Sequence, residues 1–249
     1  MTNRNIDTIF FDVGATLRYV VEDKTFAAKA EHKLMQLVGT TEPHDVFFEK
    51  LENNWKAYRK QAKATLLDCS EMELWIHYML PDYPADHIGA NAAKLTRLWR
   101  DHDGRRLAHD GVVSTLKELK RRGYKLGIIA NTITETEIPD WMCSAGVADC
   151  FKTVILSSKV RLRKPDPAIY LLASRSIGSV PERCAYVGDN PVRDVEGAVE
   201  AGYGCMVLFE DAGTADREGK APTHLPDFKI KTIPDLLDLF PDRGVNQNV

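Results

Sequence analysis

The apolar residues of this chain are spaced in two different ways. Short continuous apolar runs occur at residues 9–11 and again after residue 125, and such runs are typical of strands that are buried on both faces of a parallel sheet. Between them the apolar positions recur every three and four residues, which predicts amphipathic helices. We therefore expect an α/β protein whose strand pattern is interrupted by a helical segment.

Four helices are predicted in this segment, over residues 25–37, 46–58, 70–80 and 88–99. The third begins with a capping box, in which Ser70 and Glu73 satisfy each other's backbone N–H groups, and it ends at Pro81. We predict that residues 19–105 form a helical-bundle domain inserted into a core made of residues 1–18 and 106–249. The alternative is that these helices form one half of a single compact domain.

The rest of the chain alternates strands and helices. Gly123 ends a helix over residues 110–123 and leads into a strand at 126–129. Further strands are predicted near residues 154–156, 184–187, 205–209 and 228–230, and further helices near 167–176, 192–201 and before Phe240. This order predicts a Rossmann-like parallel sheet with helices on both faces. The tail after Asp242 is expected to be disordered.

Composition excludes several classes of protein. The 249 residues contain 33 Lys and Arg against 36 Asp and Glu, a net charge of -3, so neither nucleic acid nor a membrane surface is an expected partner. The polar N-terminus lacks a secretory signal and no apolar stretch is long enough to cross a bilayer, so we expect a cytoplasmic protein. The 5 cysteines are scattered without a Cys-x-x-Cys pair, which argues against a zinc or redox site.

Polar side chains follow three of the predicted strands. Asp12 comes directly after the first apolar run, Asn131 follows the strand at 126–129, and Asp189 follows the strand at 184–187. Because the carboxyl ends of parallel strands meet at one edge of a sheet, we expect these side chains to converge there. Lys164, which precedes a predicted helix start, is expected to join them.

Four segments together resemble the haloacid dehalogenase superfamily of hydrolases. They are Asp12-Val13-Gly14-Ala15-Thr16, Ala130-Asn131-Thr132, Lys164-Pro165-Asp166-Pro167 and Gly188-Asp189-Asn190-Pro191-Val192-Arg193-Asp194. Members of that family carry such motifs in this order, and many have a helical cap after the first motif. The resemblance covers nearly the whole chain, and the helices within residues 19–105 would correspond to the cap.

The resemblance implies a phosphatase that acts on a small phosphorylated metabolite. Asp12 would attack phosphorus to form an aspartyl phosphate, with Lys164 and Thr16 as the other catalytic residues. The phosphoryl group would be bound by Asn131, Thr132 and Lys164. Mg²⁺ would be held by Asp12, Asp189 and the backbone carbonyl of Gly14. Asp194 would not bind the metal directly but would orient a bound water or Lys164.

Two positions depart from the family pattern. Gly14 stands where the family places a second acid, and general acid-base help of that kind is worth about 10²–10⁴-fold in rate. Ala130 stands where the family places Ser or Thr, and a phosphoryl oxygen that loses its only partner there would lose roughly 1–3 kcal/mol. We expect metal binding to survive the change at Gly14, whose backbone carbonyl remains, and Asn131 or Thr132 to be available for the hydrogen bond lost at Ala130.

Three other functions remain open. The two losses are compatible with a catalytically impaired protein that binds a phosphorylated ligand or a protein partner through the same crevice. Carbon-halogen cleavage needs no such acid, but relatives with that activity lack the acidic pair supplied here by Asp189 and Asp194. Phosphonate cleavage would need a lysine of the cap as a Schiff base, for which the chain offers Lys24, Lys29 and Lys56. Neither the substrate nor the oligomeric state is predicted.

Overall fold

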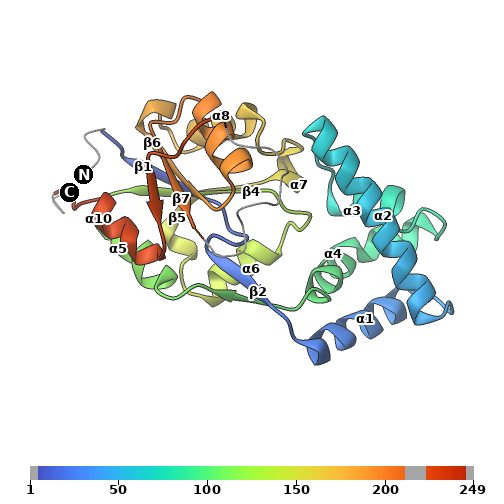
Figure 1. Cartoon of the computed structure of the whole chain (residues 1–249). Helices are drawn as coiled ribbons and strands as arrows, with labels where there is room; N and C mark the ends of the chain where they lie inside the picture. The colour runs from blue at the N-terminus through green and yellow to red at the C-terminus, as the bar shows by residue number, and fades with distance from the viewer. Residues whose placement is uncertain (1–4, 211–222, 245–249) are drawn as a thin grey trace.

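The computed structural model describes residues 5–210 and 223–244, and within them a parallel sheet of 6 strands forms the core (Figure 1). The strand order is β5-β4-β1-β6-β7-β8, so β1 lies in the middle with β4 and β6 on either side. The strands are β1 (Thr8–Phe11), β4 (Lys125–Ala130), β5 (Phe151–Leu156), β6 (Cys184–Gly188), β7 (Cys205–Phe209) and β8 (Phe228–Ile230).

Helices cover both faces of the sheet because successive side chains of a strand point to opposite faces. Ile9 and Phe11 pack into one apolar cluster, which α5, α6 and α10 complete, whereas Phe10 packs into a second cluster with α8 and α9. The helices are α5 (Val112–Arg121), α6 (Glu137–Ser144), α8 (Pro167–Ser176), α9 (Gly197–Glu200) and α10 (Leu236–Leu239). The predicted fold class is therefore confirmed.

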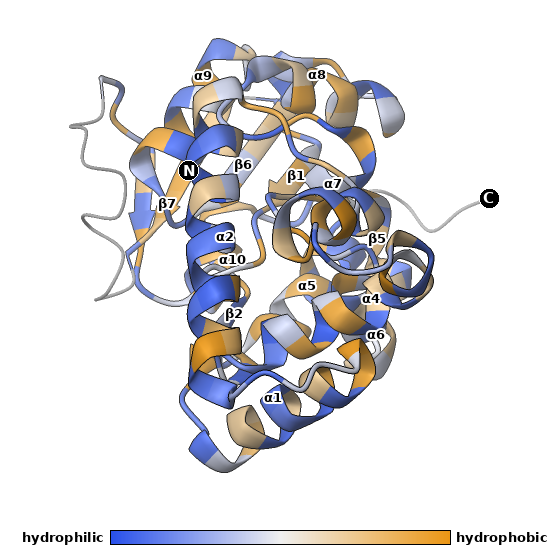
Figure 2. Ribbon diagram, turned by 90° about the vertical axis from the view of Figure 1, so that its right-hand side faces the viewer, coloured by the Kyte–Doolittle hydropathy of each residue, from blue (hydrophilic) through white to orange (hydrophobic). Residues whose placement is uncertain are grey.

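A helical insert follows β2 and precedes β3 (Figure 1). It contains α1 (Lys24–Val38), α2 (His44–Thr65), α3 (Glu71–Glu73), the π-helical turn η1 (Leu74–Met79) and α4 (Ala85–Asp101). Hydrophilic and hydrophobic stretches alternate along α1 and α2 (Figure 2), as expected of helices with one buried side. The apolar sides surround a cluster centred on Leu34, Leu51, Trp75 and Leu95, and the predicted capping box of Ser70 and Glu73 is present.

Two short strands connect the insert to the core, and the sequence analysis missed both. β2 (Arg18–Val21) and β3 (Arg105–Ala108) pair antiparallel, with Arg18 opposite Ala108. Each strand has only 4 residues, which is too short for a clear alternation of apolar and polar positions. The expected boundaries at 18/19 and 105/106 fall inside these strands. Gly104, at φ 121, is required because a Cβ there would collide with the carbonyl of Val21.

The insert also contacts the core away from these strands. Arg163 Nη1 lies 3.0 Å from each carboxylate oxygen of Asp68, at the end of the loop that follows α2. The backbone N–H of Glu135 donates to Glu71 Oε1 at 2.8 Å. These contacts fix the insert over the carboxyl edge of the sheet.

The chain end is only partly described. The segment after Asp242 was expected to be disordered, yet the Arg243 N–H donates to the Arg122 carbonyl at 3.2 Å. Residues 245–249 lie outside the described residues. None of the helices in the described ranges has the length and apolar character that a membrane crossing needs.

Candidate active site

Three neighbouring strands end in polar residues at one edge of the sheet. Asp12 follows β1, Asn131 follows β4 and Asp189 follows β6, and the Asp12 N–H donates to the Val187 carbonyl of β6 at 2.9 Å. The strand register places Phe11 beside both Ile128 and Val187. The structure thus brings together the residues that the strand ends were expected to bring together.

Lys164 is buried among them, with 1% of its surface exposed. Its Nζ lies 2.9 Å from Asp12 Oδ1 and 2.7 Å from Asp194 Oδ1, and it donates to Tyr186 Oη at 2.7 Å. A buried ammonium is stable only when it is paired and hydrogen-bonded, and these three oxygens supply its partners. Tyr186, which the sequence analysis missed, is itself fixed by donating to the Ile129 carbonyl at 3.0 Å.

Asp12, Asp189 and Asp194 form a buried acidic cluster, with one oxygen from each lying within 4.8 Å of the others. Both oxygens of Asp194 have partners, since Oδ1 accepts a hydrogen bond from Lys164 Nζ and Oδ2 accepts the Asn190 N–H at 3.0 Å. Burial opposes the charge of Asp194, but Lys164 and Arg193 outweigh it and hold the pKa of Asp194 below its ordinary value. Burial, together with the neighbouring carboxylates, raises the pKa of Asp189.

Arg193 is a further charged member of the site. Its Nη2 lies 3.5 Å from Asp12 Oδ2 and 3.4 Å from Asp189 Oδ1, so the guanidinium bridges two carboxylates. When all three carboxylates are ionised, the two cations leave a net charge of about -1 at the centre of the site. The sequence signal for Arg193 was its place between the two aspartates of one motif, to which no role had been given.

The remaining predicted site residues, Thr16, Asn131 and Thr132, differ in their hydrogen-bond partners. Thr16, fully buried, donates to Asp189 Oδ1 at 3.1 Å. The side chain of Asn131 forms two hydrogen bonds with the backbone of Lys164, each 2.9 Å long, so its amide positions Lys164. The hydroxyl of Thr132 accepts the Thr134 N–H at 3.1 Å, and because no described residue accepts its own proton, that proton is available to a ligand.

A cavity of about 430 Å³ opens beside Asp12. Both departures from the family pattern, Gly14 and Ala130, line it together with Asn131 and Thr132. A Cβ added to Gly14 would meet no atom within 4 Å. The cavity therefore has unfilled space at the position from which an acidic side chain would act.

The donor set suits a magnesium ion. Mg²⁺ prefers oxygen ligands and is commonly held by one or two carboxylates, and Asp12 and Asp189 offer such groups beside the cavity. The net negative charge of the cluster favours a cation. The guanidinium of Arg193, which bridges both carboxylates, would have to shift as a cation approached them.

Comparison with known proteins decides the family. The sequence pattern of the group described as haloacid dehalogenase-like hydrolase matches residues 6–202. The chain belongs to the haloacid dehalogenase-like hydrolases. The match spans the helical insert and every segment that carries Asp12, Lys164 and Asp189, so the resemblance seen in the sequence is confirmed.

Relatives within these hydrolases carry several names. A glyceraldehyde 3-phosphate phosphatase of Methanopyrus kandleri is 28% identical over 227 residues, which cover 83% of this chain and 95% of that protein. A phosphoserine phosphatase of Thermus thermophilus is 34% identical over 125 residues, 50% of this chain and 47% of the relative. Among solved structures, a 2-haloacid dehalogenase from Pseudomonas syringae covers 95% of this chain at a TM-score of 0.64 and 22% identity, all of that structure being matched. This last likeness concerns the fold alone.

Proposed function

We propose that this haloacid dehalogenase-like hydrolase is a magnesium-dependent phosphatase that acts on a small phosphorylated metabolite through an aspartyl phosphate on Asp12. The observation that carries the proposal is the position of Asp12, which is buried at the end of the central strand, paired with Lys164 and open to a cavity of about 430 Å³. The phosphatase names of the two relatives agree with it.

The chain's own residues account for the first chemical step. Lys164 holds Asp12 Oδ1, and Oδ2, which lies 3.5 Å from Arg193 Nη2, would attack phosphorus in line. A bond forms between Asp12 and phosphorus while the ester bond breaks, and water later hydrolyses the acyl phosphate. Lys164 offsets negative charge at the nucleophile, and Thr16 fixes Asp189 through the 3.1 Å hydrogen bond to its Oδ1.

Asp12, Asp189 and the Gly14 carbonyl would hold Mg²⁺, with Asp194 acting on the site through Lys164. When bound, Mg²⁺ supplies electrostatic stabilisation of the phosphoryl oxygens and lowers the repulsion between two anions.

Gly14 restricts the substrates that such a phosphatase turns over. Among the described residues lining the cavity, the acidic ones are Asp12 and Asp189, and both have other roles in the proposal. Among these described lining residues no further carboxylic acid is then left to protonate the leaving oxygen. We infer that esters with good leaving groups react much faster than alkyl esters.

The helical insert would serve as a cap. It has its own apolar cluster, contributes Arg100 to the cavity lining and is joined to the core by the short strands β2 and β3. We propose that residues 19–105 are a separate cap domain whose position over the sheet edge selects the substrate.

The test is release of phosphate or phenolate from a panel of esters with Mg²⁺. We expect metal-dependent turnover that Asp12→Asn abolishes and that the control Asp82→Asn, at an exposed position of the insert, leaves unchanged. Turnover that persists in folded Asp12→Asn protein would refute the nucleophile.

A second candidate function is binding without turnover. Gly14 and Ala130, which remove an acid and a hydroxyl from the cavity wall, favour it. Absence of turnover on every ester, together with binding of phosphate analogues, would support this reading. Phosphonate cleavage lacks such support, since none of Lys24, Lys29 and Lys56 lines the cavity.

A further inference from the structure

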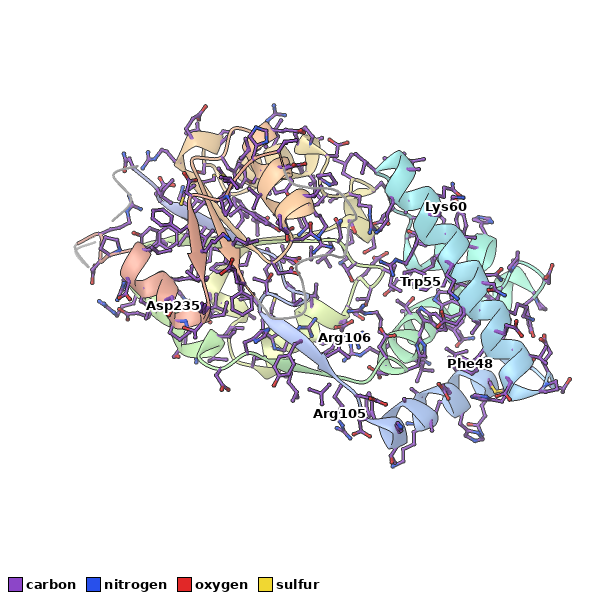
Figure 3. All side chains as sticks on the ribbon, viewed as in Figure 1. Phe48, Trp55, Lys60, Arg105, Arg106 and Asp235 are labelled. Carbon is purple, nitrogen blue, oxygen red and sulfur yellow. The ribbon has the colours of Figure 1, made fainter. Side chains whose placement is uncertain are left out.

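Besides Arg193, three arginines line the same cavity as Asp12. Arg18 belongs to β2, Arg100 to α4 and Arg106 to β3. They come from the insert and from the two strands that connect it to the core, and Figure 3 shows Arg106 where these two parts meet. Neither the family motifs nor the proposed mechanism gives these residues a role.

One carboxylate organises the three arginines. Glu137 of α6, only 3% exposed, accepts hydrogen bonds from Arg18 Nη2 at 2.8 Å and from Arg100 Nε at 2.9 Å, and Arg106 Nε lies 3.5 Å away. Burial alone would raise the pKa of Glu137, but the charges of Arg100, Arg18 and Arg106 hold it at about 2.

Glu137 does not bind all of the guanidinium N–H groups of the three arginines. Arg106 is engaged at both terminal nitrogens, since its Nη1 donates to the Arg100 carbonyl and its Nη2 lies 3.1 Å from Asp103. Arg18 uses Nη2, and within the described part of the chain its buried Nε has no hydrogen-bond partner. Arg100 donates through Nε, and its two terminal nitrogens, which have no hydrogen-bond partner among residues 5–210 and 223–244, remain for a ligand.

The charge of the cluster also favours an anion. Arg18, Arg100 and Arg106 line this side of the cavity, whereas the neighbouring acids Glu137, Asp101 and Asp103 do not, so this part of the cavity wall is positively charged. Burial lowers the pKa of Arg18. Burial, together with the charge of Arg100, lowers the pKa of Arg106 to about 10. A tether between insert and core would leave no buried donor unmatched.

We infer that Arg18 and Arg100 form a subsite for a second anionic group, a carboxylate or a phosphate, on the molecule whose phosphoryl group lies at Asp12. This inference rests on the proposed function for the position of the phosphoryl group. Two guanidinium groups present planar sets of N–H donors that match either anion. The favoured substrate class is a small phosphate ester that carries a second negative charge.

The test compares three ligands that cannot be hydrolysed. We would measure Kd by isothermal titration calorimetry with Mg²⁺ for 3-phosphonopropionate, methylenediphosphonate and propylphosphonate, the last of which lacks a second anionic group. The expected result is binding of at least one of the first two about tenfold or more tighter than propylphosphonate, because charged hydrogen bonds are the strong ones. The tighter of the two identifies the anion as carboxylate or phosphate.

Variants on one helix supply the control. Arg100→Gln should remove most of the preference for a second anionic group, and Arg100→Lys should retain part of it. Arg97→Gln should leave the preference unchanged, because Arg97 is on the same helix but pairs with Asp140 outside this cavity. Circular dichroism verifies that each variant is folded. Equal Kd values for the three ligands, an undiminished preference in Arg100→Gln, or no binding of any ligand would overturn the subsite.

The two proposals fail in different ways. Asp12-dependent turnover without any preference for a second anion would refute the subsite and keep the phosphatase. A preference that depends on Arg100 in a protein that turns over no ester would refute the phosphatase and keep the subsite.

Discussion

Replacing Glu137 with Gln tests how much the buried carboxylate at the centre of the arginine cluster stabilises the fold. Glu137 lies on α6 of the core, and its partners lie on β2, α4 and β3. Gln keeps the shape of the side chain and removes its charge. The substitution therefore leaves three arginines with one buried counterion fewer, which is costly because one partner of a buried ion pair is lost.

The size of the effect follows from the pKa of Glu137. The pKa falls from an ordinary 4.5 to about 2 in the folded protein, and at about 1.36 kcal/mol per pH unit this corresponds to about 3 kcal/mol of stability. Since the folded-state pKa is lowered, the contribution is fully present above about pH 4.5 and is lost as the pH falls towards 2. The variant should be less stable than the wild type at pH 7 by about 3 kcal/mol.

Urea denaturation at pH 7, 5.5, 4 and 3 measures this difference. We expect the free energies of unfolding of wild type and Glu137→Gln to converge as the pH falls below 4.5. Glu200→Gln, at an exposed position at the end of α9, is the control and should track the wild type throughout. A gap between wild type and Glu137→Gln that is as wide at pH 3 as at pH 7 would refute the assignment of the carboxylate as the source of this stability.

Three further predictions concern the centre of the site. Gly14→Asp combined with Ala130→Ser should raise kcat for alkyl phosphate esters by about 10²–10⁴-fold, because the Cβ at position 14 has free space; no gain in the folded double variant would show that more than these two groups is missing. Lys164→Met should lower the free energy of unfolding by about 3–5 kcal/mol in urea denaturation, because Asp12 and Asp194 lose a shared buried cation; an unchanged midpoint would contradict this. Arg193→Gln should tighten Mg²⁺ binding in calorimetry, because a cation bridging Asp12 and Asp189 is removed; weaker binding would show that Arg193 helps to organise the site.

The fold was predictable in segments where the spacing of apolar residues fits only one kind of secondary structure. The continuous run at residues 9–11 indicated a strand buried on both faces, and it became the centre of the parallel sheet. Apolar spacing of three and four residues indicated the helices of the insert. The strands β2 and β3 were missed because each is stabilised by its partner strand across the insert, and four residues alone carry no pattern.

The site was predictable only as far as the backbone determines it. Asp12, Asn131 and Asp189 were found because strand ends meet at a sheet edge, whatever their side chains do. The amide of Asn131 was considered available for a ligand, but it binds the backbone of Lys164. That contact, like the position of Arg193, depends on side-chain direction in the assembled fold, which spacing along the chain does not encode.

The missing acid and the arginine cluster have a common consequence. A site without an acid at position 14 must gain its rate from orientation and from binding energy. Contacts to a non-reacting part of the substrate accelerate the reaction only when they are stronger in the transition state or fix the reacting geometry. Arg18 and Arg100 are suited to the second role, because Glu137 holds both and the subsite lies in the same cavity as Asp12. We therefore expect the ester with a second anionic group to show a higher kcat than its neutral counterpart as well as a lower KM. An advantage confined to KM would mean that the arginines bind substrate without orienting it.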